Sequence, residues 1–236
     1  MGNLKLTSPN CFANGGPIPR KYGYKQENVS PPLKIEGIPD EAKSLTLIME
    51  DPDAEKCGFS RPYIHWVAYN ILPATPNHSF YRIPEANPGV TPITKVARDK
   101  MTKEERTKRF NEYIKKSYHD ESQHYTRNFH PMLAVNDFGE FAYGGPAPPS
   151  GIDFPVRHKY FFRLFALRIG SYQEYAQIPK PGFGEQQAKK DKGRTLLLTA
   201  ESVKMAIKKH IIEEATLTGT YQTDEEFAKT NSSPKS

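Results

Sequence analysis

Three runs of apolar, β-branched and aromatic residues constrain the fold most: SLTLIME (44–50), IHWVAYNI (64–71) and KYFFRLFAL (159–167). Turn-forming residues bound each run, as is typical of strands buried in packed sheets. None approaches the length of about 20 apolar residues that a membrane helix needs. The 21 prolines and 16 glycines among 236 residues also favour short strands and ordered loops over a helix bundle. The sequence therefore predicts a mostly β protein.

One amphipathic helix is expected near the C-terminus. Thr199 is a suitable N-cap, and the apolar residues that follow recur every four positions, at Val203, Ile207 and Ile211. Beyond them, Thr and Tyr residues around Gly219 predict one more short strand, and 223–236 is predicted to be a flexible tail.

A second helix is expected in the basic segment 95–116. This segment has nine basic and four acidic residues, and Thr102 with Glu105 fits a capping box. Its apolar face is thin, so a solvated surface helix is the simpler interpretation. The alternative is contact with an anionic membrane or an acidic partner. Nucleic acid is not an expected partner, because stacking aromatic residues are not interleaved with the basic ones.

Cysteine content indicates a reducing compartment. Cys11 and Cys57 are too few for a disulfide framework, and no Cys/His spacing resembles a zinc site. The opening MGNLKLTSPN lacks the apolar core of a signal peptide. We therefore expect a cytoplasmic location, peripheral to membranes if the basic segment contacts lipid, with no cofactor and no metal.

Polar residues gather where the predicted strands begin or end. Asp51 and Asp53 follow the first strand, His65 opens the second, and His158 precedes the third, just after the loop YGGPAPPSG (143–151). Strand ends distant in sequence can converge, so these residues predict a site where two imidazoles and a carboxylate meet beside glycine-rich backbone. Taken singly, each has a structural alternative: an Asp-Pro-Asp turn, hydrogen-bonded histidines and a rigid loop.

Five motifs occur in order along the chain: DPDA, HW followed by Asn70, NDFGEFAYGGPAPPSG, HKY and HIIEEATLTGTY. Together they resemble the phosphatidylethanolamine-binding protein family, also called the Raf kinase inhibitory protein family, and are most similar to its bacterial-type branch. The resemblance runs through a single domain, 1–222, which an insertion interrupts at about 80–131.

The resemblance implies an antiparallel β-sandwich with an amphipathic C-terminal helix, to which this chain adds a peripheral helical insertion. It also implies a small pocket for phosphate or a phosphorylethanolamine-type head group. The matching positions are Asp51, Asp53, His65, Gly145, Pro146, His158 and Tyr160. Two nearby positions depart from the family pattern, since Glu55 replaces a proline and Lys159 replaces an arginine.

An aspartate beside an anion site needs a role other than binding the anion, because its negative charge would repel the anion. We expect Asp51 to accept a proton from His65 or His158 and so to orient that ring. Asp53 is expected to serve the loop more than the ligand.

The function expected from the resemblance is that of a non-enzymatic binding and regulatory module. Its partners would be a phospholipid head group or small phosphate-like anion and a protein kinase or protease, in membrane-linked signalling. The alternative is a hydrolase acting on a phosphoester through the Asp/His cluster. No catalytic residue is assigned, because no Gly-x-Ser-x-Gly elbow is present and acidic neighbours would oppose a Cys57 thiolate.

If the basic segment contacts lipid, binding to liposomes with acidic head groups will weaken steeply with salt, because such attraction is screened over about 8 Å at physiological ionic strength. Changing Lys108, Arg109, Lys115 and Lys116 to Glu should abolish binding in a cosedimentation assay, whereas exchanging the three lysines for Arg should preserve it. Equal binding by the wild-type and Glu variants would support the solvated-helix interpretation.

Overall fold

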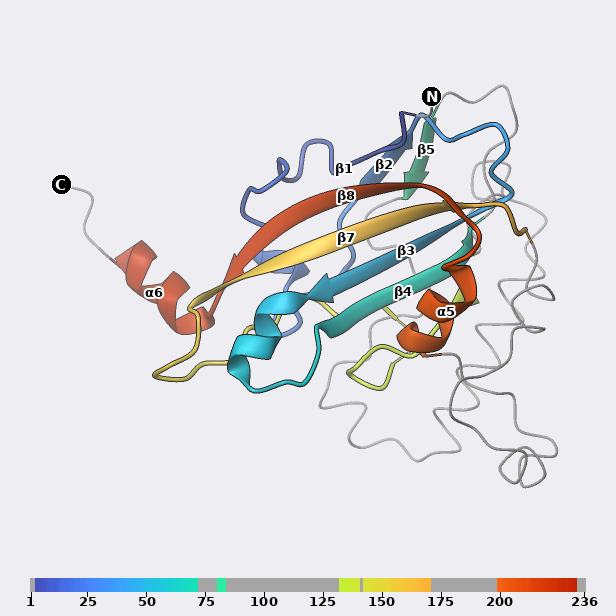
Figure 1. Cartoon of the computed structure of the whole chain (residues 1–236). Coiled ribbons are helices and arrows are strands. Elements are labelled where there is room, and N and C mark those ends of the chain that lie inside the picture. The colour runs from blue at the N-terminus through green and yellow to red at the C-terminus, as the bar shows by residue number, and fades with distance from the viewer. Residues whose placement is uncertain (1–2, 72–79, 84–131, 141, 171–198, 233–236) are drawn as a thin grey trace, which may run out of the picture.

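The computed structural model describes residues 3–71, 80–83, 132–140, 142–170 and 199–232. Its strands are β1 (Lys5–Thr7), β2 (Leu33–Glu36), β3 (Ser44–Asp51), β4 (Tyr63–Ile71), β5 (Phe80–Ile83), β6 (Met132–Leu133), β7 (Arg157–Leu167) and β8 (Ile211–Gln222) (Figure 1). Its helical elements are the 3-10 turns η1 (Arg20–Tyr22) and η2 (Pro52–Cys57) and the α-helices α5 (Ala200–Ile207) and α6 (Asp224–Ser232).

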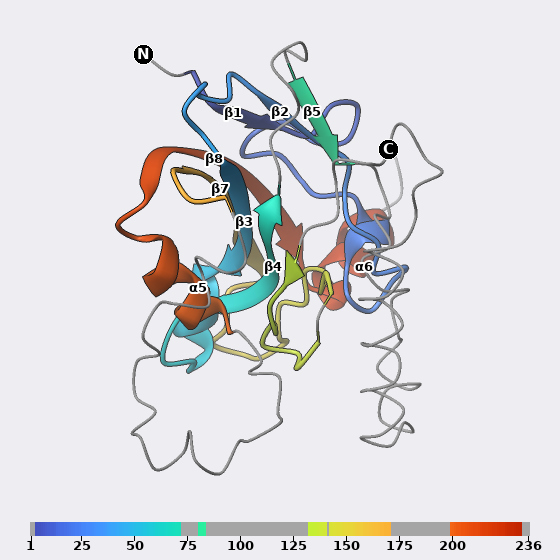
Figure 2. The ribbon, with the colours of Figure 1, turned by 90° about the vertical axis from the view of Figure 1, so that its right-hand side faces the viewer.

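The strands form two antiparallel sheets. A three-stranded sheet has the order β1-β2-β5, and a five-stranded sheet has the order β6-β4-β3-β7-β8. Figure 2 shows them as separate layers. Residues of both sheets share one hydrophobic core, in which Leu33 and Ile35 of the small sheet cluster with Leu47 and Phe162 of the large one. The prediction of a mostly β, antiparallel fold is confirmed.

The central strand β3 is buried along its whole length. Because successive side chains of a strand point to opposite faces, Leu47 and Met49 enter the core between the sheets, whereas Ile48 enters a second core. That second core also contains Val203 and Ile207 of α5. A strand that is buried on both faces has apolar residues at consecutive positions, and this explains the apolar run SLTLIME.

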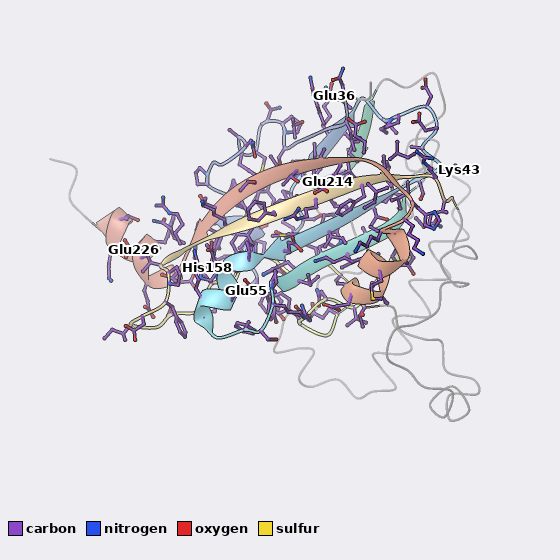
Figure 3. The ribbon with its side chains drawn as sticks, in the orientation of Figure 1. Glu36, Lys43, Glu55, His158, Glu214 and Glu226 are labelled. Carbon is purple, nitrogen blue, oxygen red and sulfur yellow. The ribbon has the colours of Figure 1, made fainter. Side chains whose placement is uncertain are left out.

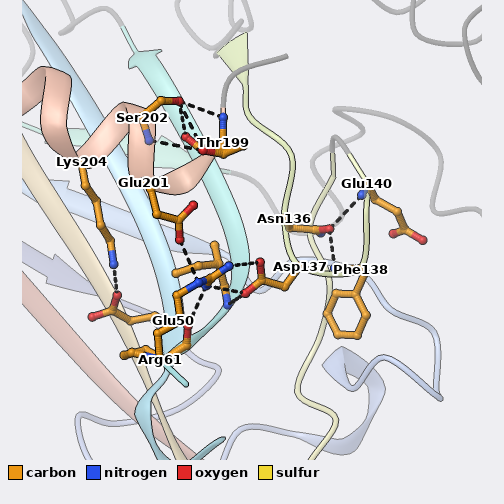
Figure 4. Close-up of polar contacts among 12 residues, drawn as sticks. Glu50, Arg61, Asn136, Asp137, Phe138, Glu140, Thr199, Glu201, Ser202 and Lys204 are labelled. Carbon is orange, nitrogen blue, oxygen red and sulfur yellow. Dashed lines mark hydrogen bonds and ion pairs between the residues drawn. The ribbon is translucent and has the colours of Figure 1, made fainter. Parts of the chain in front are cut away.

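Helix α5 is held by its cap and by ion pairs. The Thr199 hydroxyl accepts a hydrogen bond from the Ser202 amide at 3.3 Å, and the Ser202 hydroxyl accepts one from the Thr199 amide at 2.9 Å, so the predicted cap is confirmed. Lys204 Nζ lies 2.6 Å from Glu50 Oε2 on β3 (Figure 4). Arg61 pairs with Asp137 and with Glu201 at the start of the helix.

This helix ends sooner than the sequence predicts. It stops at Ile207, and Ile211, which continues the four-residue repeat, begins β8 instead. The expected short strand around Gly219 is part of this 12-residue strand, which pairs with β7 from Arg157 to Leu167. Pairing with β7 runs along β8 from Ile211 to Gln222 with one register shift near Leu167, and this outweighs the local helical pattern.

The segment 223–236, predicted to be a flexible tail, contains α6. Acidic residues occupy its first turn, where they interact favourably with the helix dipole, and Arg20 pairs with Asp224 and lies 4.6 Å from the Phe227 ring centre. Flexibility of this segment stays a prediction.

The basic segment 95–116 and most of the predicted insertion lie outside the described residues. None of the helices that the structure describes is long and apolar enough to cross a bilayer.

Leu47→Ala tests the packing between the sheets. Leu47 is completely buried, so its truncation should lower the free energy of unfolding by about 2–5 kcal/mol in urea denaturation. Met205→Ala is the matched control, because Met205 is 52% exposed and its truncation should change stability by less than about 0.5 kcal/mol. Equal effects would contradict the assigned core.

Candidate functional site

The predicted site residues converge at one end of the five-stranded sheet. Strand β3 ends at Asp51, and its antiparallel neighbours β4 and β7 begin beside this end. Antiparallel pairing therefore brings His65, near the start of β4, and His158, near the start of β7, close to Asp51. Figure 3 shows His158 beside η2, the turn that carries Glu55.

Asp51 contacts His158 directly. Its Oδ2 lies 2.7 Å from His158 Nδ1, and both side chains are buried. Its Oδ1 accepts a hydrogen bond from the Ala54 amide at 3.2 Å, because Asp51 is the N-cap of η2 and Pro52 follows it. One carboxylate thus fixes both the turn and the imidazole. Of the two histidines considered as partners of Asp51, the structure brings His158 into this contact.

The other nitrogen of His158 faces a thiol. Cys57 Sγ lies 3.6 Å from His158 Nε2, where the last residue of η2 comes back towards the sheet. Gly58, with φ 92°, ends the turn in the left-handed region that favours glycine. Burial, helped by Asp51 and Asp53, raises the pKa of the Cys57 thiol. Cys57 was not predicted as a site residue, although Asp51 and Pro52 form a turn signal that would have placed it near the aspartates.

His65 is held by a bulge and by backbone carbonyls. The β3–β4 register shifts between Met49 and Glu50, which leaves His65 without a β3 partner. Its Nδ1 donates to the carbonyl oxygens of Gly144 and Gly145 at 2.8 and 3.0 Å. The neutral ring then presents a lone pair on Nε2.

Burial lowers the pKa of His65, and the nearby Asp51 opposes that effect only in part. The ring is therefore neutral at pH 7.

Tyr160 contributes a buried hydroxyl. Its ring packs edge-on against His65 with 5.1 Å between centroids, and the residue is completely buried. The hydroxyl has no hydrogen-bond partner of ordinary geometry among the described residues, although Asp51 and the Ala147 backbone are close enough to act on it. Burial, and then Asp51, raises the pKa of Tyr160 well above its usual value. Tyr160 is therefore a neutral phenol at neutral pH.

Asp53 holds the loop, as expected. Its Oδ2 accepts from the Lys159 amide at 2.8 Å, and its Oδ1 lies 2.6 Å from Lys56 Nζ. Burial works against ionisation of this carboxyl, but these two donors keep the pKa of Asp53 below its ordinary value. Asp53 therefore positions η2 against the start of β7.

Gly145 and Pro146 are hydrogen-bonded through their backbone to the N-terminal segment. The Gly145 amide donates to Asn28 Oδ1 at 2.7 Å, and the Pro146 carbonyl accepts from the Tyr24 amide at 3.0 Å. A side chain at position 145 would place its Cβ 2.0 Å from the Tyr22 carbonyl oxygen, so only glycine fits. Because Asn28 uses the Gly145 amide, this amide is not the donor for a ligand.

Several supporting residues were not predicted from the sequence. Asn136 Nδ2 donates to the carbonyl oxygens of His65 and Ala142 and so fixes the loop that carries the Gly144 and Gly145 carbonyls. The Phe138 ring packs edge-on against His65 with 5.3 Å between centroids. Both residues lie in the motif NDFGEFAYGGPAPPSG, but the motif alone did not assign them a role, because that role depends on contacts with His65, which is more than 70 positions away. Within the described residues, no group of three or more His, Cys, Asp or Glu residues is arranged to hold a metal ion.

A comparison with family models matches residues 8–222 to the phosphatidylethanolamine-binding proteins. The chain belongs to the phosphatidylethanolamine-binding protein family. A UPF0098 protein of Methanothermobacter thermautotrophicus is 32% identical over 93% of this chain and 98% of its own length. A UPF0098 protein of Archaeoglobus fulgidus is 35% identical over 69% of this chain, and the aligned part spans only 40% of that relative.

Among solved structures, the phosphatidylethanolamine-binding protein homolog CT736 from Chlamydia trachomatis is 26% identical, with a TM-score of 0.57 over 95% of this chain and 100% of its own. The bacterial-type branch of the family fits these matches. The roles of the seven site residues in binding stay predictions.

The depressed pKa of His65 predicts a stability that depends on pH. Below the ordinary histidine pKa of about 6.5, this residue binds a proton in the unfolded chain but not in the folded one. The stability that the neutral ring contributes is therefore fully present above pH 6.5 and is lost as the pH falls through the folded pKa. An NMR titration should place the His65 midpoint below 6.5, and His65→Asn should flatten the fall in unfolding free energy on acidification. A midpoint at or above 6.5 would contradict this assignment.

Proposed function

We propose that the chain binds a small phosphate-like anion, such as a phospholipid head group, at the Asp51–His65–His158–Tyr160 cluster. The buried Tyr160 hydroxyl carries the proposal: among the described residues it has no hydrogen-bond partner of ordinary geometry, and its ring packs against the His65 ring. A buried hydroxyl left unpaired costs about 1–3 kcal/mol. Binding a ligand oxygen would recover this cost.

The chemistry favours a protonated phosphate group. Its anionic oxygen accepts from the Tyr160 hydroxyl, and its P–OH donates to His65 Nε2 or to Asp51. A fully ionised group would be repelled by Asp51 and would find no proton on neutral His65. Affinity should therefore fall as pH rises above about 6, the second pKa of a phosphate monoester. His158 acts through Asp51 in this scheme, since its Nε2 faces Cys57.

A regulatory role follows if occupancy of this site changes contact with a partner. Modulation of a protein kinase, a protease or membrane-linked signalling rests on family membership. The resemblance does not imply the contact between Cys57 and His158. It does not imply the insertion predicted at about 80–131 either.

Tyr160→Phe tests the proposed hydroxyl. Isothermal titration with phosphate and with phosphorylethanolamine should show about ten-fold weaker binding, because a hydrogen bond to a charged group is lost. The free variant should be at least as stable as the wild type, since the described residues offer that hydroxyl no partner of ordinary geometry. Tyr221→Phe is the control, because that hydroxyl donates to the Arg20 carbonyl, and it should leave affinity unchanged. Unchanged affinity in Tyr160→Phe would reject the proposal.

The Asp51–His158 pair gives a second test. His158→Ala should weaken binding by about ten-fold or more, because Asp51 loses the partner that orients it. Asp51→Asn should weaken binding as well, although it removes a negative charge from an anion site. Tighter binding by Asp51→Asn would show that Asp51 acts through repulsion alone. Turnover of a phosphoester that either substitution abolishes would favour the hydrolase alternative.

A further inference from the structure

The geometry points to a nucleophilic site: we propose that Cys57 attacks activated esters or thioesters and that His158, oriented by Asp51, takes the thiol proton. This inference goes beyond anion binding. It uses Asp51 and His158 in a second role and does not require that a phosphate binds.

Three side chains form a continuous series of contacts. Asp51 Oδ2 lies 2.7 Å from His158 Nδ1, and His158 Nε2 lies 3.6 Å from Cys57 Sγ, a normal separation for a hydrogen bond to sulfur. The buried carboxylate holds the proton on Nδ1, which leaves the Nε2 lone pair facing the thiol. The Asp53 carbonyl oxygen, 3.7 Å from Cys57 Sγ, is a second acceptor for the thiol proton. A nucleophile, a base and a residue that orients the base are thus present in the order that nucleophilic catalysis needs.

The thiol is more exposed than its base. Cys57 is half-buried at the end of η2, while His158 and Asp51 are buried. We therefore expect an acyl donor to meet the thiol before the imidazole. Cys11 is also half-buried, but no described histidine contacts it, which makes it an internal control.

The electrostatics define how the thiol reacts. Burial and the two aspartates raise the pKa of Cys57, so the thiolate is scarce at neutral pH. Proton transfer to His158 must then accompany attack, rather than precede it in a stable ion pair. We therefore expect iodoacetamide to alkylate Cys57 slowly, because it reacts with a thiolate that is already ionised. Acylation of Cys57 should instead depend on His158.

The reaction balances with water as the second reactant. Sulfur forms a bond to the acyl carbon as its proton passes to His158 Nε2. The bond from that carbon to the leaving oxygen of an ester, or to the leaving sulfur of a thioester, breaks as the proton passes to the leaving atom. Water then attacks the thioester, gives a proton to His158, and releases the carboxylic acid while the proton returns to sulfur. Ester and water thus yield acid and alcohol.

The test is acetylation of the full chain by 4-nitrophenyl acetate. We follow nitrophenolate release by absorbance and locate the acetyl group by mass spectrometry. Acetyl should appear on Cys57 well before Cys11, and Cys57→Ala should abolish the rapid release while Cys11→Ala preserves it. His158→Ala should slow acetylation by about 100-fold or more, as expected for loss of a general base. Asp51→Asn should slow it too.

Three results would overturn the inference: no acetylation of Cys57, equal acetylation of Cys57 and Cys11, or a Cys57 rate that neither His158→Ala nor Asp51→Asn changes. If His158→Ala does not fold by circular dichroism, Asp51→Asn and the two cysteine variants decide. Titration of Cys57→Ala with phosphate separates the two proposals, because anion binding does not need the thiol, whereas acyl transfer does. Retained phosphate binding without any Cys57 acetylation in the wild type would reject acyl transfer alone, whereas acetylation without phosphate binding would reject the anion site alone.

Discussion

A buried carboxylate organises the candidate site of this protein. Asp51 is almost fully removed from solvent, so both of its oxygens need partners, and it finds them in the Ala54 amide and the His158 ring. The first contact forms η2 and the second orients the imidazole. Because η2 ends at Cys57, the same residue brings the thiol to His158.

The sheet allows this arrangement because β3 lies between β4 and β7. Antiparallel pairing places the end of one strand beside the starts of two others, and the bulge opposite Met49 and Glu50 frees His65 from the ladder. Its Nδ1 is then held by two carbonyls of the loop that Asn136 and Asn28 support. The two rings therefore differ in their contacts, since the His65 ring packs against Tyr160, whereas His158 presents Nε2 to Cys57.

The two proposed activities differ in what they need from the same residues. Anion binding needs the Tyr160 proton and a protonated phosphate that tolerates Asp51. Acyl transfer needs Asp51 as an anion behind His158 and a thiol in front of it. Family membership bears on the first activity. The second depends on a cysteine that the family motifs, as they stand in this chain, did not single out.

The strands and the motif residues could be predicted from the sequence, because apolar runs and turn residues are local signals that tertiary contacts here reinforce. Ile211 shows where a local signal fails: it continues a helical repeat, yet it pairs with Leu167 of β7 and begins β8. The choice of His158 as the partner of Asp51, and the position of Cys57 at its other nitrogen, came from the folded chain alone. These contacts join residues more than 100 positions apart, and strand register, which no local pattern encodes, sets their distances.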